Sequence, residues 1–172
     1  EYTIHYYRYW RKNRRLNEDG SFGVDINRNY SYQWGYDNQG SSSEPASPIY
    51  RGPAPFSEPE TQAIRDLVQG KSFRAMITYH SYSQLILYPW GYTETPSPQD
   101  QTLKEIASTM SQLMQPVNGR IYDYGQAGAL LYVTNGDTTD WTFGVYGMPS
   151  FTIELPPIDQ IHGGFFNAEQ DI

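Results

Sequence analysis

The fold is decided by residues 73–91, which read FRAMITYHSYSQLILYPWG. Residues 73–79 and 85–88 are rich in β-branched, aromatic and other apolar residues, and this predicts two short strands. The first strand ends at His80, and Pro89 closes the second. Both runs lack a regular alternation of polar residues, as is typical of strands that are covered on both faces of a sheet.

Helical patterns lie on both sides of these strands in the sequence. Ser57 is followed by Pro59 and Glu60, which predicts a helix that Ser57 caps and Gly70 ends. After the strands, apolar residues at helical spacing predict a second helix over residues 99–114, stopped before Pro116.

The last third of the chain completes the pattern. Residues 138–146 predict a short helix and 151–155 a further strand, whereas 117–137 are rich in Tyr and Gly and predict irregular structure. Helices that alternate with short apolar strands predict an α/β fold with a mixed, largely parallel sheet and helices on both faces. Chemistry in such folds gathers at the carboxyl ends of strands, where His80 and Glu154 lie.

Composition limits the class of protein. The 172 residues match a single domain and include no cysteine, which excludes a disulfide scaffold and a thiol nucleophile. The chain has 16 Tyr but only 12 Lys and Arg together, so uncharged residues supply much of its polarity. We interpret this composition as a sign of a secreted protein. No run approaches the roughly 18 apolar residues of a membrane helix, so we expect no membrane partner.

Charge is distributed unevenly along the chain. Five of the 12 basic residues lie in the first 15 positions, whereas six basic and 15 acidic residues follow residue 28. A nucleic-acid partner is not expected, because phosphate binding needs a broad positive surface. The basic cluster is either an anion site or a solvated turn. Arg28 beside Asn27 is a plausible anion clamp, since the planar guanidinium binds a carboxylate through two hydrogen bonds.

Two further residues stand out from their surroundings. Glu154 interrupts an apolar strand, where a carboxylate needs a cation or a catalytic task unless the strand end is open to water. His80 is one of three histidines, with His5 and His162. Without other information, a single His in a strand is more often a hydrogen-bonded core residue than a metal ligand.

Six blocks of sequence follow one another in the order seen in a known family. They are residues 10–14, 23–30, 57–60, 80–84 with 88–92, Tyr132 with 140–141, and 151–155. Together they resemble the zinc metallocarboxypeptidases of the carboxypeptidase A/B type. The resemblance implies an enzyme that releases C-terminal amino acids from peptides and carries one zinc ion in its complete domain.

The resemblance also implies roles for the matched residues. His80 would be a zinc ligand, Glu154 the general base that deprotonates zinc-bound water, and Arg11 the residue that stabilises the oxyanion. The implied substrate-binding residues are Asn27, Arg28, Tyr132, Arg8, Tyr82 and Phe165. The first three of these would hold the terminal carboxylate, which makes such an enzyme an exopeptidase.

The same match implies a side-chain pocket formed by Gly91, Ala127 and Thr139. Thr139 is neither the bulky aliphatic residue of a strict apolar preference nor the acid of a strict Lys/Arg preference. Asp137 is read either as an acid that attracts a basic side chain or, more readily, as a solvated loop acid. We therefore expect a broad or mixed preference.

The sequence also departs from the family pattern. The family takes two zinc ligands from a His-x-x-Glu motif, which is absent here, so His80 alone would hold zinc weakly or not at all. We therefore expect residues 1–172 to be the C-terminal portion of a single catalytic domain, incomplete at both ends and inactive alone. Such a piece would expose a sheet edge and could self-associate.

Two other interpretations stay open. The first is a metal-free module that binds peptide C-termini without hydrolysis. The second is a carbohydrate-binding module, which explains the many aromatic residues but neither Arg28 nor Glu154.

Overall fold

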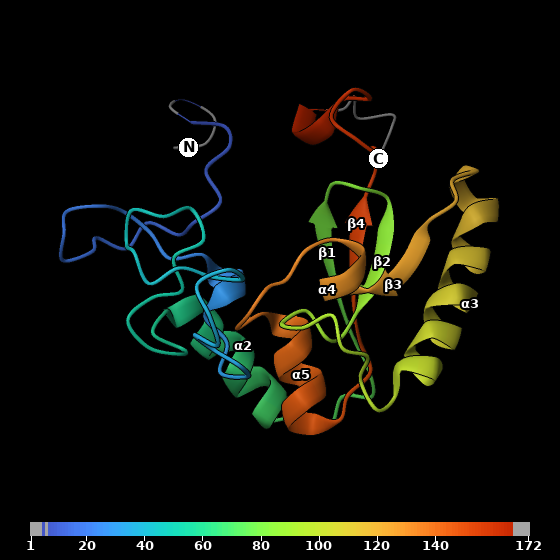
Figure 1. The fold of residues 1–172 in the computed structure, drawn as a ribbon, viewed down its shortest axis with the longest axis horizontal. Coiled ribbons are helices and arrows are strands. Elements are labelled where there is room, and N and C mark those ends of the chain that lie inside the picture. The colour runs from blue at the N-terminus through green and yellow to red at the C-terminus, as the bar shows by residue number, and fades with distance from the viewer. Residues whose placement is uncertain (1–4, 6, 167–172) are drawn as a thin grey trace. The chain divides into compact units, whose positions relative to one another are not determined.

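The structure is a computed structural model, and it describes residue 5 and residues 7–166 (Figure 1). The chain forms two compact units. The first unit comprises Glu1–Ser72 and Thr134–Thr138, and the second comprises Phe73–Val133 and Thr139–Ile172.

The second unit is built around a four-stranded sheet with the order β1-β4-β2-β3. Its strands are β1 (Met76–Ser81), β2 (Leu85–Tyr88), β3 (Asp123–Gln126) and β4 (Ser150–Leu155). β1 pairs with β4, and β2 with β3, in parallel, whereas β2 and β4 are antiparallel. The predicted mixed, mostly parallel sheet is thus confirmed. β3 was not predicted, because the sequence DYGQ has no apolar run.

Helices α3 (Asp100–Asn118), α4 (Ala127–Leu130) and α5 (Thr138–Tyr146) accompany the sheet. In Figure 1, α3 runs alongside β3, and contacts join it to both β2 and β3. The hydrophobic core combines residues of α3, α5, β2 and β4 with Tyr122; its buried members are Ile86, Tyr88, Leu103, Ala107, Tyr122, Phe143, Phe151 and Ile153.

The end of α3 differs from the prediction. The helix continues through Pro116 and ends at Asn118, before Gly119, which adopts a φ of 72°. A proline in the last turn removes one helical hydrogen bond and leaves the rest of the helix intact, so Pro116 does not stop it. The left-handed glycine is the effective stop signal.

β1 lies at one edge of the sheet. Among the described residues it pairs with β4 alone. Ile77 and Tyr79 are 47% and 64% exposed, although they face the same side as the buried Phe151 and Ile153. The sheet therefore presents an apolar edge, as the sequence predicted.

The first unit consists mainly of loops, with the 3-10 helix η1 (Ile26–Arg28) and α2 (Pro59–Gln69). Asn29 organises these loops from a fully buried position. Its Nδ2 donates to the carbonyl oxygens of Arg51 and Ala54 and to Ser57 Oγ, and its Oδ1 accepts from the Thr61 hydroxyl. Side-chain hydrogen bonds thus replace the regular secondary structure that this part lacks.

The start of α2 is held by an ion pair rather than by a serine cap. The N-cap residue is Glu58, and Ser57 Oγ donates to Glu58 Oε1, so the predicted Ser57 cap is wrong. Glu58 also accepts from Asn13 Nδ2 and Arg15 Nη1, each at 2.7 Å. Burial raises the pKa of Glu58, but these hydrogen bonds and the Arg15 charge outweigh it and leave the pKa below its usual value.

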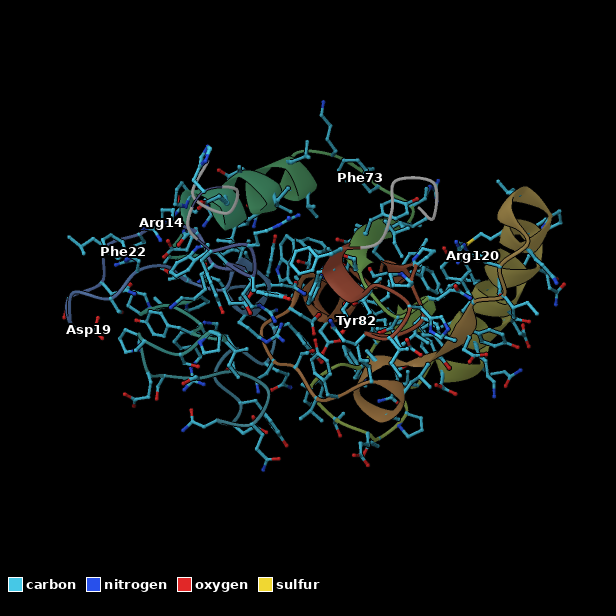
Figure 2. All side chains as sticks on the ribbon, turned by 90° about the horizontal axis from the view of Figure 1, so that it is seen from above. Arg14, Asp19, Phe22, Phe73, Tyr82 and Arg120 are labelled. Carbon is cyan, nitrogen blue, oxygen red and sulfur yellow. The ribbon has the colours of Figure 1, made fainter. Side chains whose placement is uncertain are left out.

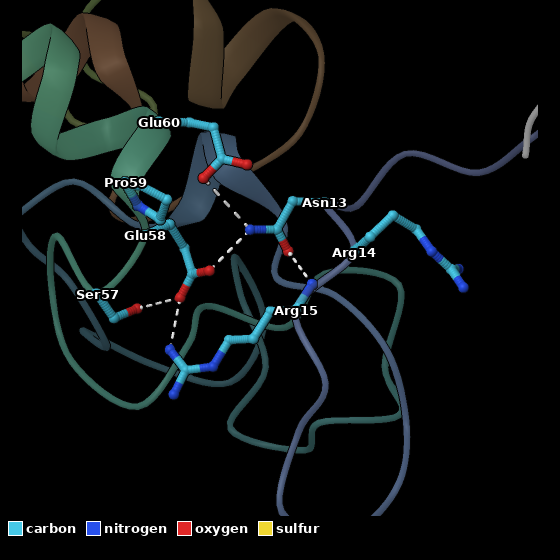
Figure 3. A pocket seen from close by; sticks show the side chains of 7 residues that line it. All are labelled: Asn13, Arg14, Arg15, Ser57, Glu58, Pro59 and Glu60. Atoms are coloured by element: carbon cyan, nitrogen blue, oxygen red, sulfur yellow. Dashed lines mark hydrogen bonds and ion pairs between the residues drawn. The ribbon is translucent and has the colours of Figure 1, made fainter. Parts of the chain in front are cut away.

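This group of polar residues lines a hollow of about 470 Å³ (Figure 3). Figure 3 shows the Glu58 carboxylate between Asn13, Arg15 and Ser57, while Arg14 points away from them. The Arg14 guanidinium lies over the rings of Trp10 and Phe22, at 4.7 and 4.5 Å from their centroids. Most of the basic cluster is thus held by carboxylate or aromatic partners.

Residues 134–138 join the first unit from a distant part of the sequence. Tyr30 N donates to Gly136 O, and Asn135 Nδ2 donates to Asp37 Oδ1 at 2.7 Å. Gly136 has a φ of 72°, and a Cβ there would lie 2.6 Å from Arg28 O. Glycine is therefore required at this point, because both the backbone conformation and the close approach exclude a side chain.

The remaining short element is the 3-10 helix η2 (Gly164–Phe166). None of the helices among the described residues has both the length and the apolarity needed to cross a bilayer.

Candidate active site

His80 and Glu154 are brought together by strand pairing in the second unit. They are register partners on the parallel strands β1 and β4, which places their backbones about 4.8 Å apart on one face of the sheet. Glu154 is also the partner of Leu85 across the antiparallel β2 pair. The side chains of a His and a Glu thus emerge next to each other at the carboxyl ends of two parallel strands.

The surroundings of the two residues differ. Glu154 is 7% exposed and His80 is half-buried, so the open strand end that the sequence allowed for Glu154 is not observed. A buried carboxylate beside an imidazole is an arrangement suited to proton transfer or to holding a cation.

Asn27 and Arg28 form a pair of hydrogen-bond donors in the first unit. Arg28 is 3% exposed, and its Nη1 donates to Asn27 O at 2.7 Å. Its buried Nε has no hydrogen-bond partner among the described residues. Asn27 Oδ1 accepts from the backbone and hydroxyl of Thr138, which orients the amide. These two donors determine the position of the amide oxygen.

A buried guanidinium N–H without an acceptor lowers the stability of the folded protein by about 1–3 kcal/mol or more, because its lost contact with water is not replaced. A ligand with oxygen acceptors would remove this cost. The adjacent donors of Arg28 and Asn27 therefore suit an anion such as a carboxylate.

Arg11 is positioned by Asp25 in the same unit. Its Nη2 lies 3.1 Å from Asp25 Oδ2, and the Asp25 side chain is 4% exposed whereas that of Arg11 is 47% exposed. Asp25 Oδ1 accepts from Asn27 N at the start of η1. One buried carboxylate thus connects Arg11 with the Asn27 backbone and leaves the Arg11 guanidinium partly open to solvent.

Tyr82 and Phe165 are in contact in the second unit. Their ring centroids are 4.7 Å apart in an edge-to-face arrangement, and Tyr82 (labelled in Figure 2) donates from its hydroxyl to Gln160 Oε1. The segment after β4 is therefore joined to the loop after β1. The contact is consistent with a shared apolar surface.

The other matched residues are more scattered. Tyr132 is 51% exposed, Arg8 is exposed, and Thr139 is buried in α5 at 7% exposure. Gly91 is buried and Ala127 is half-buried, both in the second unit with Thr139.

Asp137 is not a solvated loop acid. It is 3% exposed and accepts a hydrogen bond from Thr134 Oγ1. That interpretation of the sequence is corrected, because residues 134–138 are packed into the first unit rather than open to water.

Two residues important to the site were missed by the sequence analysis. Asp140 and Gln126 are buried and hydrogen-bond to the loop after β2. Asp140 carried a signal as part of a matched block, but Gln126 lies in a region that predicted irregular structure and carried none.

The described residues contain no group of three or more His, Cys, Asp or Glu side chains that could hold a metal ion. A catalytic zinc site has three protein ligands and a water. His80 and Glu154 alone therefore do not amount to a zinc site.

The comparisons with known proteins agree with this geometry. The family model described as zinc carboxypeptidase matches residues 1–172, and the chain belongs to this family. Its curated relatives include carboxypeptidases of both the A and the B type.

Three relatives illustrate the similarity. The chain is 38% identical over 154 residues to a metallocarboxypeptidase A-like protein of Trichophyton verrucosum, covering 86% of this chain and 36% of that protein. It is 38% identical over 178 residues to carboxypeptidase B of Astacus astacus, covering 99% and 57%. Bovine thrombin-activatable fibrinolysis inhibitor, solved in complex with tick carboxypeptidase inhibitor, matches with a TM-score of 0.90 and 34% identity, over 98% of this chain and 57% of that chain.

The chain thus spans between about a third and just over half of the length of these relatives, at 36% and 57% of the two curated proteins.

Proposed function

We propose that the protein to which this chain belongs is a zinc-dependent metallocarboxypeptidase that releases C-terminal amino acids from peptides. The observation that carries the proposal is the buried Arg28 Nε, which has no partner among the described residues, while Nη1 of the same guanidinium donates to Asn27 O. A free C-terminal carboxylate supplies both acceptor oxygens and the negative charge that the Arg28 guanidinium requires, whereas a mid-chain peptide offers no charge. Membership of the zinc carboxypeptidase family supports the same reaction.

Each candidate residue then has a task. Asn27 and Arg28 bind the terminal carboxylate, with Tyr132 closing over it. Arg11, anchored by Asp25, stabilises the oxyanion of the tetrahedral intermediate. Glu154 accepts the proton of the attacking water and passes it to the leaving amine. Arg8, Tyr82 and Phe165 contact the peptide further from its end.

Zinc belongs to the proposal for the complete domain. When bound, it lowers the pKa of a water and polarises the scissile carbonyl. Within this chain His80 is the proposed ligand, and the remaining ligands would come from outside it, since the part that the structure describes holds no three-residue donor group. We therefore propose that residues 1–172 are the C-terminal portion of one catalytic domain and are inactive alone.

The partners and location follow from the same proposal. The substrates are peptide or protein C-termini, and the side-chain pocket of Gly91, Ala127 and Thr139 gives a broad or mixed preference. The enzyme is proposed to be secreted, in keeping with its Tyr-rich composition of low charge.

A second candidate function is a metal-free module that binds peptide C-termini without hydrolysis. It is favoured by the absence of a three-ligand group among the described side chains. The presence of Arg11 and Glu154 in the same chain as Asn27 and Arg28 favours the enzyme, because binding alone requires neither a base nor an oxyanion donor.

One experiment separates the two functions. The 172-residue chain and the full-length gene product are assayed against a peptide with a free C-terminus and the same peptide amidated, with zinc and with a chelator. Release of the last residue from the free peptide only, by the full-length product and abolished by the chelator, supports the enzyme. Binding of the free peptide without turnover by both proteins supports the module and contradicts the enzyme. Equal hydrolysis or equal binding of the free and the amidated peptide contradicts both proposed functions.

A further inference from the structure

The loop that follows β2 is held by a buried carboxylate on α5. Asp140 is 0% exposed, and its Oδ1 accepts from Gly91 N at 2.8 Å. Its Oδ2 accepts from Gly91 N and Tyr92 N, each at 3.0 Å. Hydrogen bonds from backbone N–H groups to an ionised acceptor are stronger than neutral ones, and burial strengthens them further. Two consecutive peptide groups of the loop are therefore fixed to α5.

The carbonyl groups of the same loop are held from β3. Gln126 is 6% exposed and donates from Nε2 to Trp90 O at 3.1 Å, Thr93 O at 2.5 Å and Thr95 O at 3.2 Å. One side-chain amide thus gathers three carbonyl oxygens that would otherwise diverge. The N–H groups and the C=O groups of the loop are satisfied from two different elements.

α4 closes the third side. Gly128 N donates to Trp90 O at 3.0 Å, and a Cβ on Gly128 would lie 2.4 Å from Thr93 O. The Trp90 ring also packs on Phe143 of α5, with centroids 4.9 Å apart. Movement of residues 90–95 would therefore break contacts with β3, α4 and α5 at once, which makes this loop a rigid wall.

The loop and the two side chains that hold it lie next to the residues proposed to form the side-chain pocket. Gly91 is bound directly by Asp140, Thr139 precedes Asp140, and Ala127 follows Gln126. Each of the three small residues proposed to form the side-chain pocket is therefore tied to one of the two buried side chains. Gly91 is tied by a hydrogen bond, and Thr139 and Ala127 by the peptide bond to their neighbour. A shift of either anchor would change the width of the pocket.

We propose that Asp140 and Gln126 are positioning residues that set which C-terminal side chains the pocket accepts, by fixing residues 90–95. This inference rests on the proposed carboxypeptidase function and adds specificity-determining residues to it. Neither side chain is required to touch the reacting atoms, so both should affect substrate choice and binding more than the chemical step.

The test uses Asp140→Asn and Gln126→Leu in the full-length protein. Asparagine keeps the size of the side chain but can turn an amide NH₂ toward the Gly91 and Tyr92 N–H groups, and leucine removes the donors to the three carbonyls. The matched control is Ser111→Ala, a buried change on α3 that removes the hydrogen bond from the Ser111 hydroxyl to Tyr122 O. Two peptides that differ only in a C-terminal Ala or Phe are compared.

We expect the ratio of kcat/KM for the two peptides to change at least about fivefold in both variants, within the range that pocket contacts command. The change should come through KM, with kcat for the better substrate within about threefold of the unmodified protein. Backbone amides of Gly91 and Tyr92 should exchange faster with deuterium in Asp140→Asn. Ser111→Ala should lower stability without altering the ratio.

Each other result has a definite meaning. An unchanged ratio in the folded variants, or an equal change in Ser111→Ala, overturns the inference while the proposed function stands. If Asp140→Asn does not fold, Gln126→Leu decides alone. Absence of hydrolysis by the unmodified protein contradicts the proposed function, and this inference with it.

Discussion

Arg28 and Glu154 are charged side chains that fold into buried positions, at 3% and 7% exposure. Burial of a charge is unfavourable unless a partner or a task compensates for it. Arg28 Nε has no described partner, and Glu154 lies beside His80 in the strand register. At the scale of single residues, these two positions are the ones where stability alone does not explain the choice of amino acid.

Glu154→Gln tests the base. The amide keeps the shape of the side chain but cannot accept a proton, and the loss of a general base lowers kcat by about 10²–10⁴-fold. Peptide binding should persist, because Asn27 and Arg28 are unchanged. Steady-state kinetics and peptide-binding calorimetry measure the two effects. The exposed Glu105→Gln on α3 serves as the control, and near-normal turnover by Glu154→Gln would remove Glu154 from the mechanism.

Arg28→Lys tests the carboxylate clamp. Lysine keeps the charge but loses the planar fork and the Nε donor, so KM for peptides with a free C-terminus should rise about 10- to 100-fold, equivalent to one charged hydrogen bond. The discrimination against amidated peptides should fall by a similar factor. Arg74→Lys, at an exposed position, should change neither. If Arg28→Lys discriminated between free and amidated peptides as well as the unmodified protein does, Arg28 would not be the residue that binds the terminal carboxylate.

At the scale of elements, helix α3 carries the same amino acid, leucine, at a buried and at an exposed position. Leu103 is 0% exposed in the core, whereas Leu113 is 70% exposed on the same helix. Their helical propensity is identical, so a difference between substitutions at the two positions isolates the contribution of burial.

We expect Leu103→Ala to lower the free energy of unfolding by about 2–5 kcal/mol, since it leaves a cavity among Ile86, Phe143 and their neighbours. Leu113→Ala should change it by no more than about 0.5 kcal/mol. Urea unfolding followed by circular dichroism measures both. Equal effects would mean that α3 does not pack on the sheet as described.

The ion pair at the start of α2 makes the stability of that element depend on pH. The pKa of Glu58 is lowered in the folded state, so the folded protein binds the proton less readily than the unfolded chain. This contribution is fully present above the unfolded value of about 4.5 and is lost as the pH falls through the lowered folded value.

Glu58→Gln should therefore be less stable than the unmodified protein at pH 7, by about 1–3 kcal/mol, as expected for weakening hydrogen bonds to a charged group in a partly buried ion pair. Its stability should fall less steeply on acidification below pH 4.5. Unfolding at a series of pH values provides the measurement, with the exposed Glu60→Gln as control. Parallel acid profiles for Glu58→Gln and the unmodified protein would exclude this role.

At the scale of the whole molecule, β1 leaves an edge of the sheet open in the part of the chain that the structure describes. Ile77 and Tyr79 are exposed on it. Exposed strand edges with apolar side chains favour pairing with other chains. We propose that the isolated 172-residue chain self-associates through this edge.

Tyr79→Lys should reduce that association, because a charge on an edge strand opposes pairing with a second copy. Sedimentation velocity over a range of concentrations measures the shift toward monomer. Leu113→Lys, which places the same charge on the exposed face of α3, is the matched control. Self-association that persists in Tyr79→Lys but not in Leu113→Lys would place the contact on the helix instead.

The sequence by itself determined the features that depend on local patterns: β2, α5, β4 apart from its first residue, most of α2 and α3, and the blocks that identify the family. Apolar spacing and turn residues act over a few positions, so they can be read without the fold. The extra turn of α3 escaped this reading because Pro116 is tolerated near a helix end.

Tertiary structure alone decided the rest. β3 exists because β2 offers it a partner, and its own residues carry no strand pattern. The register that places His80 beside Glu154, the burial of Asp137 and the anchoring of Gly91 by Asp140 all join residues far apart in the chain. Such pairings depend on which surfaces meet in the folded chain. The free energy that favours them comes from contacts between distant segments, so a short stretch of sequence does not reveal it.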